Sequence, residues 1–366
     1  MSAMMKAVRL HEFGGPQVLR YEEAPRPTPG AGEMLVRVQA ASINPPDLYL
    51  RDGYRALPPQ WQPNPVFPLI PGTDIAGVVV ESGDGAHAFR AGDEVYSMVR
   101  FPQDLMKGSG AYAEYIAVPA DELALMPPGI NYLQAAAAPM SLLTAWQFLI
   151  DPGHHAPNPF QTFAHRPVSL EGKTVLINGA GGGVGHFALQ LARWKGARVI
   201  AVASGKHEAL LRELGASEFI DYTRQAAETV VPPVDLVMDA VGGANMERFL
   251  PLIKPGGALY LVNPLGFAVQ QEAARRGITV SSMQVRSSGQ QLQQAGELLA
   301  NGEVRVVTDS VYLLSDAAAA HQRASQGSIQ GKIVLRVRCG IHIASAFMLT
   351  ASAGGFIVNA DNSRRR

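Results

Sequence analysis

The chain has 366 residues, of which 47% are apolar and 17% charged, and its formal net charge at pH 7 is zero. This composition excludes a disordered chain, leaves room for two domains and gives no global attraction to nucleic acid. The single cysteine, Cys339, excludes an internal disulfide and a cysteine-rich zinc site, and it favours a reducing, cytoplasmic compartment. The first ten residues lack the apolar run of a signal peptide.

Residues 1–140 are predicted to be rich in β-strands. Short apolar runs at 34–39 and 75–80 lie between glycine and proline clusters, as expected for strands joined by turns. Several prolines make residues 56–71 an irregular loop.

Residues 141–281 alternate between strand and helix patterns, which predicts a parallel, doubly wound sheet. The expected strands are 174–178, 198–203, 219–221, 236–239 and 258–262. The expected helices are 187–195, 207–214 and 245–252. Residues 282–339 mix a helix at 290–300 with strands at 304–309 and 333–337, and we expect them to return to the first domain.

Residues 175–186 (VLINGAGGGVGH) carry the strongest signal in the chain. An apolar strand meets five glycines within seven residues, and a helix and a second strand follow. This is the order of a βαβ unit whose loop lets backbone N–H groups approach a pyrophosphate at a helix N-terminus. The fingerprint is imperfect, because it begins with alanine when read as Ala180-x-Gly182-x-x-Gly185. The predicted contacts are Gly179, Ala180, Gly182, Gly183, Val184 and Gly185.

Two segments interrupt this scheme. Residues 151–170 form a proline-rich insertion with His154, His155 and His165, for which we expect a solvated loop and no metal site. The tail, residues 340–366, is largely small or apolar and ends in three arginines. Its apolar span is short and interrupted, so we expect no membrane anchor.

Several motifs in order resemble the zinc-independent medium-chain dehydrogenases/reductases of the NADPH:quinone oxidoreductase group. The resemblance covers about residues 5–338. Besides the glycine loop, its motifs are 42–53 (SINPPDLYLRDG), 71–77 (PGTDIAG), 92–95 (GDEV), 110–115 (GAYAEY), 138–145 (APMSLLTA), 239–243 (DAVGG) and 330–335 (QGKIVL).

The resemblance implies an α/β fold: a GroES-like β-barrel domain at 1–140 and 282–339, and a Rossmann domain at 141–281. It also implies a homodimer formed through the Rossmann sheet edge, near residues 258–262. The insertion and the tail depart from the family pattern.

The second strand ends at Ala203 without the acidic residue that usually binds the ribose of NAD. Ser204, Lys206 and His207 follow instead, and they favour NADPH because they can donate hydrogen bonds or offset phosphate charge. The resemblance adds Tyr222 and Arg323 near the 2′-phosphate. Lys206, Tyr222 and Arg323 can equally be ordinary surface or strand-end residues.

The resemblance places Thr144, Val241, Asn263 and Lys332 at the cofactor, with Thr144 beside the nicotinamide. Packing inside a helix is the alternative for Thr144.

On the acceptor side, the expected catalytic residues are Asn44, Asp47, Tyr49 and Tyr54. Asn44 would contact the nicotinamide ribose or the substrate, or else it is a turn residue before Pro45. Asp47 would orient the site, with Arg51 as a possible partner. Tyr49 and Tyr54 would line the pocket or donate a proton. Trp61 would cover the acceptor or pack within its loop.

We therefore predict a metal-free, NADPH-dependent reductase that transfers hydride to a small electrophile, a quinone or an α,β-unsaturated carbonyl compound. Without zinc cysteines there is no metal to polarise an alcohol, so an already electrophilic acceptor is favoured. An enoyl-thioester reductase is one alternative. A protein that binds NADPH without catalysing a reaction is the other.

Overall fold

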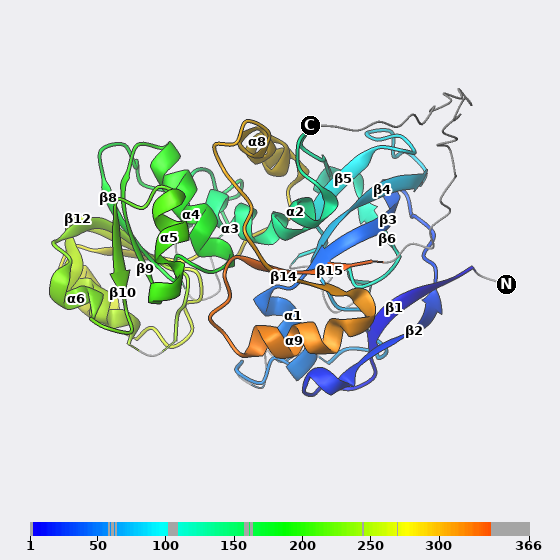
Figure 1. The fold of residues 1–366 in the computed structure, drawn as a ribbon, viewed down its shortest axis with the longest axis horizontal. Coiled ribbons are helices and arrows are strands. Elements are labelled where there is room, and N and C mark those ends of the chain that lie inside the picture. Colours follow the sequence, from blue (N-terminus) through cyan, green and yellow to red (C-terminus); the bar gives the residue numbers. More distant parts are fainter. Residues whose placement is uncertain are drawn as a thin grey trace, which may run out of the picture.

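A computed structural model of the chain describes most of its residues. These are residues 3–57, 59, 62, 64–101, 109–156, 161, 164–243, 245–268 and 270–337. Three predictions made above concern residues outside these ranges: Trp61, Cys339 and the tail from residue 340. The described chain builds two main sheets, one at the left of Figure 1 and one at the right.

The first sheet is parallel and has six strands in the order β10-β9-β8-β11-β12-β13. The strands are β8 (Thr174–Asn178), β9 (Arg198–Ala203), β10 (Glu218–Asp221), β11 (Val234–Asp239), β12 (Ile253–Leu261) and β13 (Thr279–Ser281). Consecutive strands run outward from β8 on one side and from β11 on the other, so the strand order reverses between these two. In such sheets, ligands bind beyond the carboxyl ends of the strands at this reversal.

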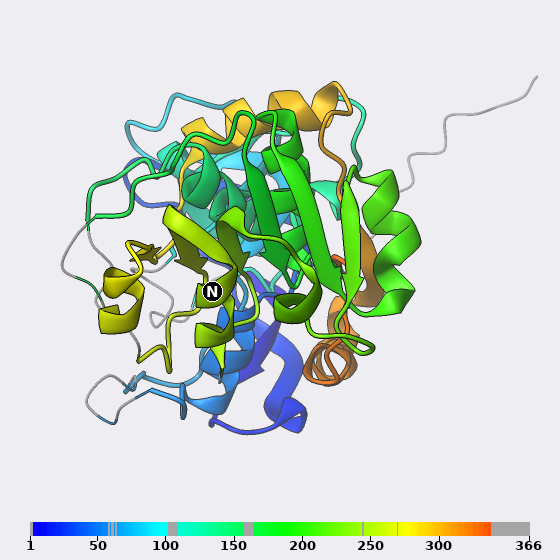
Figure 2. The same ribbon diagram turned by 90° about the vertical axis from the view of Figure 1, so that its left-hand side faces the viewer.

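Both faces of this sheet are covered by helices (Figure 2). Residues along β8 alternate, because Val175 and Ile177 pack into one core while Leu176 packs into the other. The first core takes in α3 (Pro139–Leu149), α4 (Gly183–Trp194) and α5 (Glu208–Glu213). The second takes in α6 (Ala227–Val230), η6 (Met246–Leu252) and α7 (Gln270–Arg275). Burial on both faces explains why these strands are continuously apolar in sequence.

The second sheet has the strand order β14-β15-β3-β4-β5-β7, and β6 pairs with β3. The strands are β3 (Glu33–Ser42), β4 (Asp74–Ser82), β5 (Glu94–Met98), β6 (Tyr115–Pro119), β7 (Ala124–Leu125), β14 (Thr308–Leu313) and β15 (Lys332–Arg336). A separate hairpin joins β1 (Met4–Leu10) to β2 (Leu19–Pro25). Strand β15 pairs with β3, so the C-terminal part of the described chain lies in the sheet built by the N-terminal part.

The remaining helices are short or lie outside the parallel sheet. They are α1 (Pro45–Asp52), α2 (Tyr132–Ala137), α8 (Gly289–Ala300) and α9 (Ala317–Ser325). Helix α9 lies near α1 in Figure 1. The domain boundaries at residues 140 and 281 remain our proposal.

Three predicted elements differ from the structure. Helix α4 begins at Gly183 and not at residue 187, because the glycine run supplies both the turn and the first helical turn. Residues 246–252 form a 3₁₀ helix that contains Pro251, which has no N–H to donate. The strand expected at 304–309 is β14, which begins only at Thr308. Before it, the backbone of Arg305 bonds to the side chain of Gln190 on α4.

The insertion is only partly the solvated loop expected from its sequence. His165 is buried, with Nδ1 2.6 Å from Ser281 Oγ and Nε2 2.9 Å from the Phe148 carbonyl oxygen. Burial lowers the pKa of His165. Within the described residues, no group of three or more His, Cys, Asp or Glu side chains is gathered as a metal site would require.

The edge strands of the parallel sheet are β10 and β13, and not residues 258–262. Residues 258–261 belong to β12, which lies between β11 and β13, so the sheet edge expected there is wrong, while the dimer itself stays a prediction. Within the described residues, no helix combines the length and apolarity needed to cross a bilayer.

Candidate active site

The glycine loop lies at the carboxyl end of β8, where the strand order reverses. Gly179 has a positive φ of 77°, and both Gly179 and Ala180 donate their N–H groups to the Val202 carbonyl of β9. Gly182 is the N-cap of α4. The first N–H groups of any α-helix have no partner within the helix, so the N-terminus of α4 can bind an anion.

Two glycines of the loop differ in what surrounds them. A Cβ on Gly185 would lie 2.1 Å from the Gly179 carbonyl oxygen, so glycine is required there for the loop and helix to pack. A Cβ on Gly182 would have its nearest neighbour at 3.4 Å, which is ordinary contact. The space beside Gly182 is therefore open to a ligand.

Other predicted cofactor residues surround this loop. Most follow the carboxyl ends of neighbouring strands: Ser204, Lys206 and His207 after β9, Tyr222 after β10, Val241 after β11 and Asn263 after β12. The structure thus brings them to one edge of the sheet. Gly183 and Val184, in the first turn of α4, face the same edge.

Lys206 and Arg323 converge on one short segment after α9. Lys206 Nζ donates to the Ser328 carbonyl at 2.5 Å, and Arg323 donates to the Gly327 carbonyl at 2.9 Å. Arg323 also forms an ion pair of 2.7 Å with Asp309. The two cations expected near a 2′-phosphate are therefore close together, although each already has a partner.

His207 is buried, and its ring lies against the glycine loop. A Cβ on Gly181 would lie 2.8 Å from His207 Cγ. Burial lowers the pKa of His207. Among the described residues, the His207 Nδ1 atom is buried without a hydrogen-bond partner.

An acid missed from the sequence lies beside the end of β9. The Asp221 carboxylate accepts a hydrogen bond from the Gly205 N–H, and it also bonds to Thr223. Sequence reasoning sought an acid at the end of β9 itself, whereas this one comes from the neighbouring strand β10. Its pKa is lowered, chiefly by the hydrogen bond from the Thr223 hydroxyl.

On the other side of the site, Asn44 is the N-cap of α1 and is buried. Its amide nitrogen donates to Thr73 Oγ1 at 3.0 Å and to Asp74 Oδ2 at 2.7 Å, and its amide oxygen accepts from Lys332. Both amide donors are used inside the protein. Its amide N–H groups are therefore not free for a ligand in this arrangement, and the predicted contact of Asn44 with the nicotinamide ribose or the substrate stays a prediction.

Lys332 lies beside Asn44 and is bonded to it. Its ammonium group donates to the Ile43 carbonyl at 2.8 Å and to Asn44, and it lies 3.7 Å from Asp74 Oδ2. The ammonium group is thus bonded within the protein, while a Cβ on Gly183 of the glycine loop would lie 3.0 Å from Lys332 Cδ. The contact of Lys332 with the cofactor stays a prediction. The preceding residue still touches the loop, because Gly331 donates its N–H to the Gly181 carbonyl at 2.8 Å.

Asp74 joins several elements at this point. Its carboxylate accepts from Ser42 on β3, from Asn44 at α1 and from the Met140 N–H in the first turn of α3. Burial raises the pKa of Asp74, while the nearby charge of Lys332 lowers it. The sequence motif contained Asp74, but nothing in the motif distinguished it from its neighbours.

Asp47 is fully buried near Asp74. It accepts from the Asn44 N–H at 2.8 Å and from the Tyr112 hydroxyl at 3.3 Å. Burial raises the pKa of Asp47 to about 7, and the Asp74 charge adds to that rise while Lys332 opposes it. The suggested direct pairing with Arg51 is wrong, since Arg51 contacts the Gly14 carbonyl and His321 instead.

Tyr49 and Tyr54 lie together at the end of α1. Their ring centroids are 5.9 Å apart, and Tyr49 is 41% exposed. Gly53 and Tyr54 both have positive φ, at 82° and 52°, which turns the chain sharply after the helix. Burial raises the pKa of Tyr54 well above its usual value, so it stays protonated at neutral pH.

Thr144 lies inside α3, and its hydroxyl donates to the Met140 carbonyl at 2.6 Å. This is the packing role that the sequence left open for it. The hydroxyl oxygen can still accept a hydrogen bond from a ligand.

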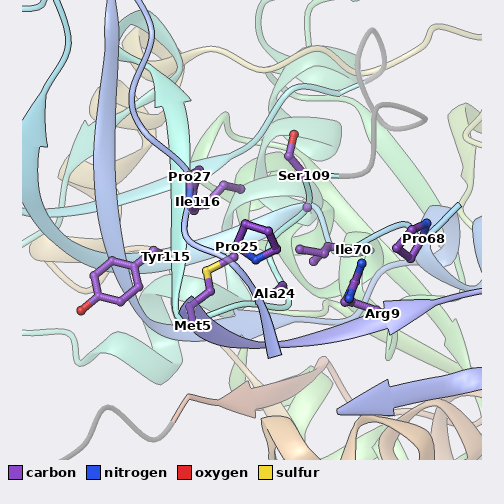
Figure 3. A pocket seen from close by; sticks show the side chains of 11 residues that line it. Met5, Arg9, Ala24, Pro25, Pro27, Pro68, Ile70, Ser109, Tyr115 and Ile116 are labelled. Carbon is purple, nitrogen blue, oxygen red and sulfur yellow. The ribbon is translucent and has the colours of Figure 1, made fainter. Parts of the chain in front are cut away.

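A separate hollow lies beside the β1–β2 hairpin (Figure 3). It holds about 240 Å³ and is lined mostly by apolar side chains, among them Met5, Pro25, Ile70 and Ile116. None of the predicted site residues lines it, so it is distinct from the site described above.

Family comparisons agree with this architecture. Residues 30–128 match the alcohol dehydrogenase GroES-like domain, and residues 214–335 match a zinc-binding dehydrogenase domain. The chain is 30% identical to a mitochondrial NAD(P)H oxidoreductase of Mus musculus, over 92% of this chain and 90% of that protein. It is also 30% identical to a quinone oxidoreductase of Mus musculus, over 91% and 98% respectively. The structure of a quinone oxidoreductase from Coxiella burnetii superimposes with a TM-score of 0.80 at 30% identity, covering 92% of this chain and all of that one.

The chain belongs to the medium-chain dehydrogenase/reductase family, in its zinc-independent quinone oxidoreductase group. Its fold is a GroES-like domain combined with a Rossmann-type parallel sheet. It is an enzyme, an oxidoreductase, and the non-catalytic alternative is set aside.

Proposed function

We propose that this enzyme uses NADPH, without a metal, to reduce quinones or α,β-unsaturated carbonyl compounds. The single observation that carries the proposal is the open glycine loop at Gly182, with two tyrosines at the end of α1 as the expected acceptor side. NADPH would supply the hydride; the protein supplies binding, orientation and a proton.

The residues around the loop fit a dinucleotide. The N-terminus of α4 offers backbone donors to a pyrophosphate, and the space beside Gly182 admits one. The buried Nδ1 atom of His207 has no partner among the described residues, so it can accept a hydrogen bond from a ligand or donate one.

Lys206 and Arg323 favour NADPH over NADH because both are cations within reach of one segment after α9. Asp221 and Asp309 oppose this preference, since each carboxylate would repel a 2′-phosphate. Both carboxylates are already bonded: Asp221 to Gly205 and Thr223, and Asp309 to Arg323 and the Gln330 N–H. We therefore expect a preference for NADPH that is real but moderate.

The donor set supports a metal-free reaction. The Lys332 ammonium occupies the space between Asn44 and Asp74, so a positive charge is already present where these oxygens converge. An ammonium cannot act as a Lewis acid on a substrate alcohol. A quinone or an activated alkene needs no such activation. Tyr54, or a water beside it, is the proposed proton donor to the reduced acceptor.

An acceptor screen tests the proposal. Purified enzyme is mixed with NADPH, and loss of absorbance by the reduced cofactor is followed with a simple quinone, an alkenal and a crotonyl thioester. We expect turnover with the quinone or the alkenal. A strong preference for the thioester would favour the enoyl-thioester reductase instead, and no turnover with any of them would refute the proposal.

Lys206→Ala tests the cofactor preference. We expect NADPH binding to weaken by about tenfold and NADH binding to change little, since one phosphate contact contributes about 1.4 kcal/mol. Lys254→Ala, in an exposed pair with Asp235 near the amino end of β12, serves as a charge-matched control. Equal weakening of both cofactors by Lys206→Ala would remove the 2′-phosphate role.

We also propose a homodimer and a cytoplasmic location. The edge strands available to a second copy are β10 and β13, and at β13 the insertion already contacts Ser281 and Ser282 through His165 and Gln161. Sedimentation of the purified chain tests the dimer, and cell fractionation tests the compartment.

A further inference from the structure

A chain of buried side chains connects the two ends of α1. Asp47 lies in its first turn and Arg51 in its last, four residues apart. They do not pair directly. His321 on α9 and Tyr112, between β5 and β6, lie between them: Arg51 NH1 is 3.3 Å from His321 Nδ1, His321 Nε2 is 3.1 Å from the Tyr112 hydroxyl, and that hydroxyl is 3.3 Å from Asp47 Oδ2.

The direction of each hydrogen bond in this series of four side chains follows from the chemistry of its donors and acceptors. A guanidinium group only donates, so His321 Nδ1 must accept from Arg51. Burial lowers the pKa of His321 to about 3, so the ring is neutral and its one proton is on Nε2. Nε2–H then donates to the Tyr112 oxygen, which leaves the Tyr112 hydroxyl to donate to Asp47. All donors therefore point toward the Asp47 carboxylate.

These side chains are buried, so water cannot replace a hydrogen bond that is lost among them. Asp47, Tyr112 and His321 have no exposed surface, and Arg51 is nearly buried. The Tyr112 and His321 rings also meet edge to face, with centroids 5.7 Å apart. Donors lost from a buried carboxylate cannot be replaced by solvent, so its charged form would be destabilised.

We propose that His321 and Tyr112 are positioning residues, which favour the charged form of the Asp47 carboxylate and clamp both ends of α1. They act on the reaction through α1, because Asn44 caps this helix, Tyr49 lies in it and Tyr54 lies in the turn that follows it. The inference rests on the proposed function, in which those tyrosines face the acceptor. His321 comes from α9, 270 residues beyond Arg51.

The groups that face Asp47 set its ionisation together. They are Asp74 on β4, Lys332 on β15, Tyr112, Tyr54 beyond α1, and Arg51 acting through His321. If one donor is removed from this set, the charged form of Asp47 loses support while the repulsion from Asp74 remains. The carboxyl group should then ionise at higher pH.

The test compares His321→Phe, His321→Gln and Tyr112→Phe with the wild type. Each enzyme is assayed with NADPH and a quinone across pH, and NADPH affinity is measured separately by titration. The phenylalanine at 321 keeps the ring but can neither accept from Arg51 nor donate to Tyr112. Glutamine can do both through its amide. Tyr112→Phe removes only the hydroxyl.

We expect both phenylalanine variants to move the acid limb of kcat/KM to higher pH, to lower kcat several-fold and to raise KM for the quinone. NADPH affinity should stay within about twofold, because Arg323 on the same helix has its own anchor at Asp309. His321→Gln should restore most of the wild-type profile, and combining the two phenylalanine changes should add little.

Three results would overturn the inference: a pH profile of either phenylalanine variant that coincides with the wild type, failure of glutamine to restore it, or full additivity of the two changes. If the wild type itself reduces none of the acceptors, the proposed function fails first. In that case, infrared titration of the Asp47 carboxyl group, assigned with Asp47→Asn, still tests the series of hydrogen bonds. The pKa of Asp47 must then be higher in Tyr112→Phe than in the wild type.

Discussion

The two sides of the candidate site differ in how their polar groups are used. At the glycine loop, the N-terminus of α4 has unsatisfied N–H groups, and the space beside Gly182 is open. Around Asp74 and Lys332, by contrast, each charged group has hydrogen-bond or ion-pair partners inside the protein. Groups left unsatisfied are suited to bind a ligand, whereas satisfied groups are suited to hold the elements that do so.

The largest loss of stability should come from removing the buried charge of Lys332. Lys332→Met keeps the length of the side chain but leaves Asp74 and Asp47 without their buried cation. We expect a loss of about 3–5 kcal/mol in the free energy of unfolding, measured with urea.

Lys254→Met is the matched control, because it removes a lysine from a surface pair with Asp235. It should cost at most about 1 kcal/mol. The double variant Lys332→Met/Asp74→Asn should recover part of the loss. If Lys332→Met costs no more than the surface control, the buried pair does not hold these elements together.

The next effect separates two glycines of the loop. Gly185→Ala places a Cβ against the Gly179 carbonyl, so we expect a loss of about 1–3 kcal/mol in unfolding free energy. Gly182→Ala should cost less, about 0.5–1 kcal/mol, because alanine is a poorer N-cap than glycine but its Cβ has free space. Equal losses in urea unfolding would mean that the loop is not built as described.

The pH dependence of stability tests the burial of Asp47. Its pKa is raised from 3.8 to about 7 in the folded protein, so the folded state binds the extra proton between these values. Stability from this group is present below pH 3.8 and is lost as pH rises through 7, by about 1.4 kcal/mol per unit of pKa difference.

Other groups obscure this trend in the wild type. The pKa values of His321 and His186 are lowered by burial to about 3 and about 4, so their contribution falls as pH drops below 6.5. The measurement is therefore the difference between the wild type and Asp47→Asn from pH 5 to 8. As pH rises from 5 to 8, the wild type should lose unfolding free energy relative to Asp47→Asn. A flat difference would contradict the assignment.

The smallest effect concerns Thr144. Thr144→Val removes the hydrogen bond to Met140 and should lower the free energy of unfolding by about 1 kcal/mol. Thr144→Ser should lower it by less. If the hydroxyl also accepts from the cofactor, the valine variant should bind NADPH a few-fold more weakly. Unchanged binding would restrict Thr144 to packing.

The glycine loop and its strands were far easier to predict from sequence than the buried polar groups around Asp74 and Lys332. Strands β8 and β9 coincide with the predicted ranges, because apolar runs bounded by glycines are local signals. The partners of Asn44 could not be predicted in this way. Lys332 lies 288 residues away from it in the chain, and only the sheet pairing of β15 with β3 brings the two together.

The same limit applies to single residues within recognised motifs. Tyr112 and Asp74 were inside quoted motifs, yet only the structure shows that they bond to Asp47 and Asn44. His321 had no signal at all, since a lone histidine in an alanine-rich helix is most often a packing residue.

The central claim, that the glycine loop holds NADPH, is tested most directly by calorimetric titration of NADPH into the wild type and Gly182→Val. The valine side chain would enter the open space beside Gly182, so we predict affinity weaker on the order of 100-fold, which corresponds to about 2.7 kcal/mol. Equal affinity for the two proteins, at equal stability to urea, would contradict the placement of the cofactor.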